Sequence, residues 1–161
     1  MEFEIDVSGD DLLNKDYVVC VANNNGIIKG FKFKEKLVKD LSSKYGQMKY
    51  KYKKSKRGKS SFRVRLYSIV VYYLFKDLGI NETISLKICK DFSGKENDIK
   101  ENLKFFLIKK LELKIENISF EKLDKKSLAD EYAYLMRKDK KNKMNTYINI
   151  NLEDFEKWLK K

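Results

Sequence analysis

Apolar and polar residues alternate at the start of the chain. In residues 3–8 (FEIDVS) the apolar side chains fall on one face of an extended segment and the polar side chains on the other. This period of two predicts a β-strand. Two more apolar runs, at 17–23 and 27–34, flank Asn25 and Gly26, a strong signal for a hairpin turn. We therefore expect a three-strand antiparallel meander.

Beyond residue 34 the spacing of apolar residues becomes helical in places. Residues 35–43 predict a short helix. Residues 62–78 are apolar almost all round and predict a buried helix that is capped by Ser60 or Ser61 and ends at Gly79. The β-branched residues in this segment leave a strand as the alternative. The later predicted elements are a strand at 83–89, a helix capped by Ser93, a strand at 113–120, a helix opened by Ser127, a strand at 146–150 and a short helix capped by Asn151.

This order of elements predicts the fold class. Three leading strands followed by alternating helices and strands indicate an α/β protein whose mixed sheet has an antiparallel meander, parallel later strands and helices on both faces. No linker rich in proline or serine divides the chain. We expect one domain over residues 1–161, with a core at about 3–139 and a strand and helix extension at 140–161.

The composition removes several kinds of chemistry. The chain has no histidine, which excludes Ser-His-Asp and Cys-His nucleophiles and histidine-bound zinc. Its two cysteines, Cys20 and Cys89, are too few for a four-ligand zinc site. We interpret them as small buried apolar side chains in a reducing compartment. No apolar run approaches the length of a membrane span and the acidic N-terminus is not typical of a signal peptide, so we expect a cytoplasmic protein without a membrane partner.

The positive charge is concentrated in one segment. Residues 41–76 contain 11 basic and no acidic residues, whereas the rest of the chain has 25 basic and 24 acidic residues. A local excess of this kind predicts a polyanionic partner, and we favour nucleic acid over a membrane surface. The alternative is a solubility feature of a thermophile rich in lysine, isoleucine and glutamate, but a compositional bias would be spread evenly.

The basic segment provides candidate contacts to a nucleic acid. Lysine and arginine can bind several phosphates, and tyrosines can stack on unpaired bases. The alternative for Tyr50 and Tyr52 is packing on an edge strand of the sheet. No element reads base edges, so we expect little sequence specificity. The predicted nucleic-acid-binding residues are Lys49, Lys51, Lys53, Lys54, Lys56, Arg57, Lys59, Arg63, Tyr50 and Tyr52.

Three aspartates are candidates for chemistry. Asp6 lies inside a strand, where aspartate is disfavoured, Asp91 follows the strand at 83–89, and Asp130 lies in the first turn of a helix. If the first and fourth strands are neighbours, Asp6 and Asp91 meet at one edge of the sheet. Clustered carboxylates require a cation, and oxygen ligands favour Mg²⁺ or Mn²⁺, here as a pair of ions. Taken singly, each aspartate has a structural alternative, as a solvated strand residue, a loop residue or an acid that complements a helix dipole.

These features resemble the ribonuclease H-like nuclease superfamily. The opening IDVSGD (5–10) is closest to an uncharacterised branch that opens with an Ile-Asp-Glu-Ser-Gly-Asp motif. That branch has an Ala-Asp pair on its last core helix, where this chain has Ala129 and Asp130, with Arg137 further along. Asp91 falls where the family has an aspartate after its fourth strand. The resemblance covers about residues 3–139.

The resemblance implies a catalytic, metal-binding set of Asp6, Asp91 and Asp130. Val7 replaces the glutamate of the opening motif, so Asp10 or Glu131 is the expected further metal ligand. Ribonuclease H proper also carries a glutamate on the helix after the third strand, but the segment 62–78 has no acid before Asp77.

We therefore expect a Mg²⁺- or Mn²⁺-dependent nuclease that hydrolyses phosphodiester bonds in DNA or RNA. The first alternative is a non-catalytic nucleic-acid-binding module on the same fold. The second is a protein-interaction subunit whose basic segment docks on an acidic partner. Convergence of the three aspartates would favour the nuclease.

Overall fold

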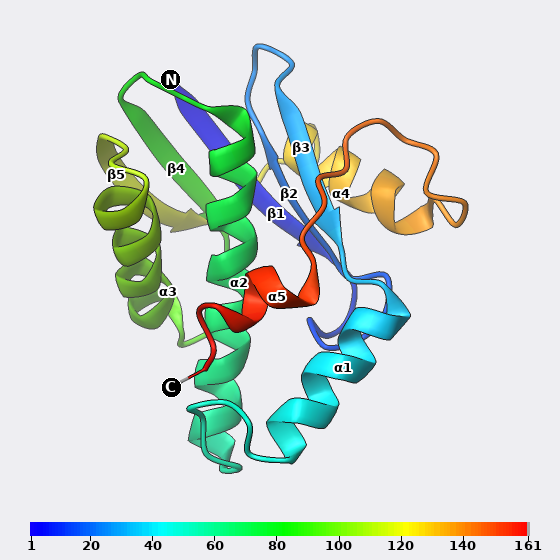
Figure 1. Ribbon diagram of the computed structural model, residues 1–161. Helices are drawn as coiled ribbons and strands as arrows, with labels where there is room; N and C mark the ends of the chain where they lie inside the picture. The colour runs from blue at the N-terminus through cyan, green and yellow to red at the C-terminus, as the bar shows by residue number, and fades with distance from the viewer. Residues whose placement is uncertain (161) are drawn as a thin grey trace.

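A computed structural model describes residues 1–160 of the chain (Figure 1). Five strands form one mixed sheet with the order β3-β2-β1-β4-β5. β1 is antiparallel to β2 and β2 to β3, whereas β4 is parallel to β1 and β5 to β4. The α/β class, the meander and the pairing of the first and fourth strands are therefore confirmed. The strands are β1 (Glu2–Ser8), β2 (Val18–Ala22), β3 (Ile28–Lys32), β4 (Ile84–Cys89) and β5 (Ile115–Glu121).

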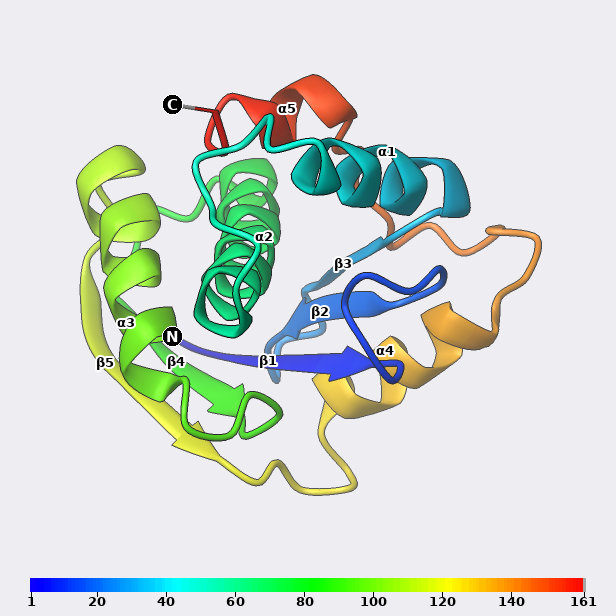
Figure 2. The same cartoon turned by 90° about the horizontal axis from the view of Figure 1, so that it is seen from below.

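Helices cover both faces of the sheet. Figure 2 shows α1, α2, α3 and α5 on one face and α4 on the other. Within residues 1–160 no helix has the length and apolarity needed to cross a lipid bilayer. The helices are α1 (Glu35–Gly46), α2 (Lys56–Leu78), α3 (Glu96–Leu103), which continues into the π-helical η1 (Lys104–Lys110), α4 (Leu128–Lys138) and α5 (Leu152–Glu156).

The larger core lies between the sheet and α2. The apolar residues of β1 face this core, and α2 is buried along most of its length. Phe155 of α5 and Leu159 are fully buried in the same core, which thus extends to the C-terminal segment. A smaller cluster of Val18, Cys20, Ala133 and Met136 holds α4 against the other face.

The start of α2 differs from the prediction. The helix begins at Lys56, and its cap is Ser55, whose Oγ accepts a hydrogen bond of 2.9 Å from the backbone N–H of Gly58, not Ser60 or Ser61. A Cβ at Gly58 would lie 2.1 Å from the carbonyl oxygen of Lys53, so only glycine fits where the loop crosses the helix. The end at Gly79, with φ of 61°, is as predicted. The first turns of α2 are polar because they extend beyond the core into solvent.

Two smaller expectations are wrong. Ser93 does not cap α3, which begins after Lys95 without a side-chain cap. The segment 146–150 forms an isolated bridge between Tyr147 and Gly30, not a strand. One pair of hydrogen bonds attaches it to β3, and the chain then turns into α5, whose predicted cap at Asn151 is confirmed.

Candidate metal centre and adjoining basic hollow

The polar face of β1 lies against α4. Ser127 Oγ donates a hydrogen bond of 3.2 Å to Glu4 Oε1, and Arg137 Nε donates one of 2.8 Å to Ser8 Oγ. Asp6 lies between these two contacts on the same face of the strand. Asp130, in the first turn of α4, is near enough to Asp6 to raise the pKa of that carboxyl, but it is exposed and is not one of the residues whose ligand atoms gather around Asp6.

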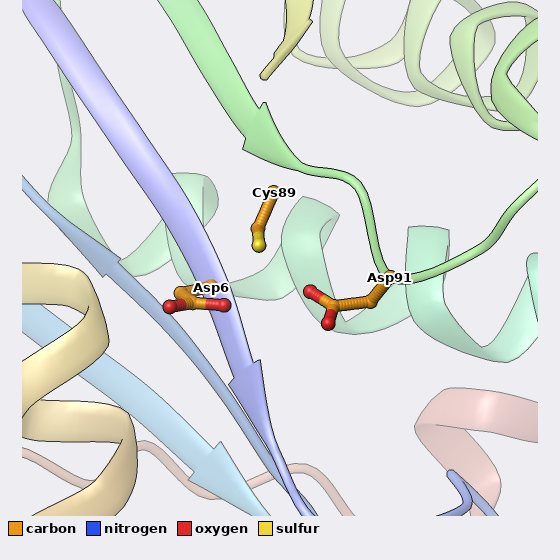
Figure 3. Close-up of side chains that lie close together, drawn as sticks. All are labelled: Asp6, Cys89 and Asp91. Carbon is orange, nitrogen blue, oxygen red and sulfur yellow. The ribbon is translucent and has the colours of Figure 1, made fainter. Parts of the chain in front are cut away.

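The parallel pairing of β1 and β4 brings a second aspartate to Asp6. Ile5 lies opposite Ile88, so the two strands end at the same edge of the sheet. Cys89 Sγ and one carboxylate oxygen from each of Asp6 and Asp91 lie within 4.8 Å of one another (Figure 3). The predicted meeting of Asp6 and Asp91 is therefore present, with a sulfur atom that was not predicted.

Asp6 is a buried carboxylate without a cationic partner. Its side chain forms no ion pair within residues 1–160, and the residue is 5% exposed. Burial above all, and then the neighbour Asp130 and the charge of Asp91, together raise the pKa of Asp6 from 3.8 to about 7. Hydrogen bonds from the Val7 N–H, at 2.8 Å, and from Cys89 act in the opposite direction. A bound cation would relieve this repulsion.

Asp10 and Glu131, the two expected additional ligands, have different surroundings. Asp10 lines a cavity of about 260 Å³ together with Asp91, so a carboxylate from the β1–β2 loop faces the same space. Glu131 is exposed on α4 and does not join the ligand group found among residues 1–160. Asp130 is likewise exposed and outside that group, so Glu131 as a ligand stays a prediction.

Gly9 shapes the wall of this cavity. Its φ is 129°, and a Cβ there would lie 2.8 Å from the ring of Tyr17. Tyr17 is buried, and its burial, followed by the charges of Asp91 and Asp11, raises the pKa of its hydroxyl well above the usual range. The Ser-Gly turn of the opening motif thus lets the chain fold closely over a tyrosine at the edge of the site.

The two cysteines have different roles in the structure. Cys20 is fully buried, as predicted, and both thiols are free. Cys89 is instead half-buried among the aspartates, where burial and a hydrogen bond with Asp91 raise the pKa of its thiol to about 12. The interpretation of Cys89 as a core residue is therefore wrong. Its position follows from the register of β1 and β4, which local sequence does not reveal.

A basic hollow adjoins the acidic cavity. We use this name for a cavity of about 500 Å³ at the N-terminal end of α2, lined by Lys56, Arg57, Lys59, Ser60, Arg63 and Lys95. Arg63 lines both cavities, and its guanidinium lies 2.6 Å from a carboxylate oxygen of Asp11. The sequence did not indicate Lys95, which comes from the loop before α3. Four of the predicted nucleic-acid-binding residues therefore share one hollow beside the aspartates.

The remaining predicted lysines lie in the loop before α2. They are exposed and form no ion pair within residues 1–160, but they do not line the basic hollow. They form a second group of cations next to it in the chain. These residues are Lys49, Lys51, Lys53 and Lys54.

The tyrosines pack on α2, not on an edge strand. Tyr50 is 1% exposed, its hydroxyl donates a hydrogen bond of 2.9 Å to Glu156 Oε2, and its ring centre lies 5.8 Å from that of Phe62. Tyr52 is half-buried, 5.7 Å from Phe62. The prediction that Tyr50 stacks on bases is therefore wrong. Phe62 is the first apolar residue of α2, and the aromatic side chains that precede it in the chain pack against it.

Comparisons of the chain with protein-family models, curated proteins and solved structures found no match. The function must therefore be argued from the arrangement itself. Its main features are aspartates at the carboxyl edge of the two parallel central strands and a basic hollow that shares Arg63 with the acidic cavity.

Proposed function

We propose that the protein is a metal-dependent nuclease with a ribonuclease H-like fold, which hydrolyses phosphodiester bonds in DNA or RNA. The observation that carries this proposal is the meeting of Asp91 and the buried Asp6 at the ends of the central strands, with Asp130 of α4 near enough to act on the pKa of Asp6. The sheet order β3-β2-β1-β4-β5 supports the fold assignment. The alternation of polar and apolar residues along β1 supports it further, since Glu4 and Ser8, on the same face as Asp6, contact α4 and the residue before it.

The donor set suits divalent cations. Asp6, Asp91 and Asp130 would hold Mg²⁺ or Mn²⁺, and the carboxylate of Asp10 faces the same cavity as Asp91. When bound, such ions activate water and stabilise the leaving oxygen of a phosphodiester. The chain itself supplies one buried carboxylate, Asp6, beside exposed carboxylates that repel it until a cation binds.

The basic hollow supports a nucleic acid as the substrate. The first turn of α2 combines free backbone N–H groups with Lys56, Arg57 and Lys59 and contains no acid. This combination attracts phosphate. Arg63 continues the positive surface to the rim of the acidic cavity, so a strand held in the hollow reaches the aspartates.

These contacts favour recognition of the backbone over recognition of bases. Lysine and arginine bind phosphates regardless of sequence. Tyr50 is not available for stacking, which leaves no specific argument for single strands over duplexes. We therefore propose cleavage with little sequence specificity.

The test is cleavage of labelled single- and double-stranded DNA and RNA, each with Mg²⁺, Mn²⁺ or EDTA. We expect metal-dependent cleavage that falls to background in Asp6→Asn and Asp91→Asn. The matched control is Asp77→Asn, because Asp77 lies at the other end of α2 and pairs with Lys29 at 3.7 Å. Metal-independent binding of these substrates without cleavage would overturn the proposal and leave a nucleic-acid-binding module.

A further inference from the structure

A separate cavity of about 540 Å³ lies on the β3 side of the molecule. It shares no lining residue with the acidic cavity or the basic hollow. Half of its lining is apolar, from Phe31, Leu37, Met144, Tyr147, Ile148 and Ile150, and the other half is polar or charged. A concave apolar space with a few polar groups is the usual form of a small-molecule site.

The segment after α4 builds one side of this cavity. It returns to β3, where Gly30 donates a hydrogen bond of 2.9 Å to the carbonyl of Thr146 and accepts one of 2.9 Å from Ile148. A Cβ at Gly30 would lie 2.6 Å from Met136, so glycine permits the close packing of α4 on the other face of β3. Figure 1 shows the segment running from α4 along β3 to α5.

The cavity contains a buried lysine that forms no ion pair with a carboxylate of residues 1–160. Lys32 is 4% exposed, and its Nζ donates to the backbone carbonyl of Asp139, at 2.7 Å, and to Asn142 Oδ1, at 2.8 Å. Nζ also lies 5.3 Å from the ring centre of Tyr147. An ammonium group has three donors, so these partners leave one.

The carboxylates near Lys32 have other partners. Asp16, whose charge acts on Lys32, pairs with Lys140 at 3.3 Å. Asp139 accepts hydrogen bonds from the Tyr147 hydroxyl, at 2.8 Å, and from the Met144 N–H, at 3.0 Å. Asp154, the only acid lining the cavity, accepts from the N–H of Asn151 within the cap of α5. Neither Lys32 nor Lys34, which also lines the cavity, forms an ion pair within residues 1–160. Among the lining residues Lys32 and Lys34 thus outnumber Asp154, and the charges of Asp16 and Asp139 act on Lys32 from outside the lining, so a ligand's charged group can still pair directly with Lys32.

We propose that this cavity binds a small organic anion, with Lys32 as the anchor of its charged group. A buried ammonium is costly to hold without a counterion, and a carboxylate or phosphate would supply one. The apolar walls fit an aliphatic or aromatic body attached to that group. This site does not depend on the nuclease activity and is separate from the aspartates.

The test is an NMR titration of the full chain with benzoate, phenyl phosphate and the neutral benzyl alcohol. We expect saturable shifts for amides of 31–37 and 142–151 with the two anions and much weaker effects with the alcohol. The stronger of the two anions identifies the preferred charged group. Lys32→Met keeps the apolar stem of the side chain, and we expect it to weaken the binding of both anions roughly tenfold or more.

Two further variants make the result decisive. Lys29→Met is the control, because Lys29 lies on the same strand and does not line the cavity. Leu37→Trp fills the cavity from a half-buried position on α1 and leaves Lys32 in place, so it should abolish binding even if Lys32→Met does not fold. Equal binding of the alcohol and the anions, or parental affinity in a folded Lys32→Met or Leu37→Trp, would overturn the proposal.

Discussion

The charge of Asp6 makes stability depend on pH. Between pH 4 and about 7 the folded protein keeps a proton on Asp6 that the unfolded chain has released, because the pKa of Asp6 is raised from 3.8 to about 7. The free energy of unfolding of the metal-free protein should therefore fall as pH rises through this window. The loss is at most roughly 4 kcal/mol, and Asp6→Asn should remove it. Urea unfolding in EDTA at pH 5 and pH 8 measures the difference.

Asp77→Asn is again the control for this measurement, since Asp77 is paired with Lys29 at the surface. It should keep the pH dependence of the parent. A parent that is equally stable at both pH values, or an Asp6→Asn variant that retains the same slope, would show that Asp6 is not the buried acid responsible.

Cys89 should influence the choice of metal ion. A sulfur ligand favours softer transition ions over Mg²⁺, which prefers oxygen. If Cys89 Sγ reaches an ion held by Asp6 and Asp91, Cys89→Ser should weaken Mn²⁺ binding more than Mg²⁺ binding. Calorimetric titration with each ion tests this, with Cys20→Ala as the control. Equal weakening of both ions would place the sulfur outside the metal's ligands.

The positions of some site residues could be predicted from the sequence, whereas those of others could not. Alternation along residues 3–8 was sufficient to place Asp6 on the polar face of β1, and the position of Asp91 after β4 follows from where the strand ends. Cys89 was missed because its place beside Asp6 depends on the pairing of Ile5 with Ile88, a contact between segments more than 80 residues apart. Asp130 and Glu131 were proposed from their position in the chain, and both are exposed on α4 and outside the group around Asp6.

Among the elements, α2 connects the basic segment to the aspartates. Lys56 and Lys59 are exposed on its first turns and line the basic hollow. Lys56→Gln with Lys59→Gln should weaken nucleic-acid binding and reduce the slope of log affinity against log salt by about 1.4 to 1.8, if each lysine neutralises one phosphate. Fluorescence anisotropy over a range of salt concentrations measures both quantities.

A matched pair on α1 controls for the loss of net charge. Lys36 and Lys39 have the same spacing, lie on a helix outside the hollow and pair with Asp40 and Glu35. Their replacement by glutamine should leave the salt slope close to that of the parent. If the two double variants lose affinity equally, the basic hollow is not the strand-binding surface and only the total charge matters.

The loop between α1 and α2 should contribute to folding through Tyr50. Removing the hydroxyl in Tyr50→Phe leaves Glu156 bonded to Lys44 at 3.0 Å but removes a bond to a charged acceptor. We expect the free energy of unfolding to fall by about 1.5 kcal/mol. Affinity for single- and double-stranded nucleic acid should not change. A selective loss of single-strand affinity, with unchanged stability, would restore base stacking as the role of Tyr50.

The elements themselves were mostly predictable, but their ends were not. Period and turn residues located β1 to β5 and the C-terminal limit of α2 at Gly79. The first turns of α2 carry no apolar side chain that would mark them as helical. They form because Ser55 caps the helix and Gly58 allows the loop to cross it. Recognising this required the position of Lys53, which only the folded chain provides.

Across the whole molecule, two opposite charge distributions meet at one edge of the sheet. Nearly all of the net charge of +12 comes from residues 41–76, whereas the aspartates come from β1, the end of β4 and α4. Arg63 and Asp11 join the two regions through their ion pair. The fold therefore places an attractive surface for polyanions beside a pocket that repels them until cations bind.

The C-terminal segment should be essential to this arrangement. Phe155 is fully buried, and its ring centre lies 5.9 Å from those of Phe31 and Phe33, so α5 closes the core over the meander. Phe155→Ala should lower the free energy of unfolding by about 3–5 kcal/mol, the usual cost of removing a buried phenyl ring. Lys157→Ala, at an exposed position two residues on, should change it by less than about 0.5 kcal/mol. Denaturant unfolding measures both variants. A loss below about 1 kcal/mol for Phe155→Ala would mean that the core ends before α5. In that case the phenyl ring would not be packed in the core, and removing it would leave no cavity.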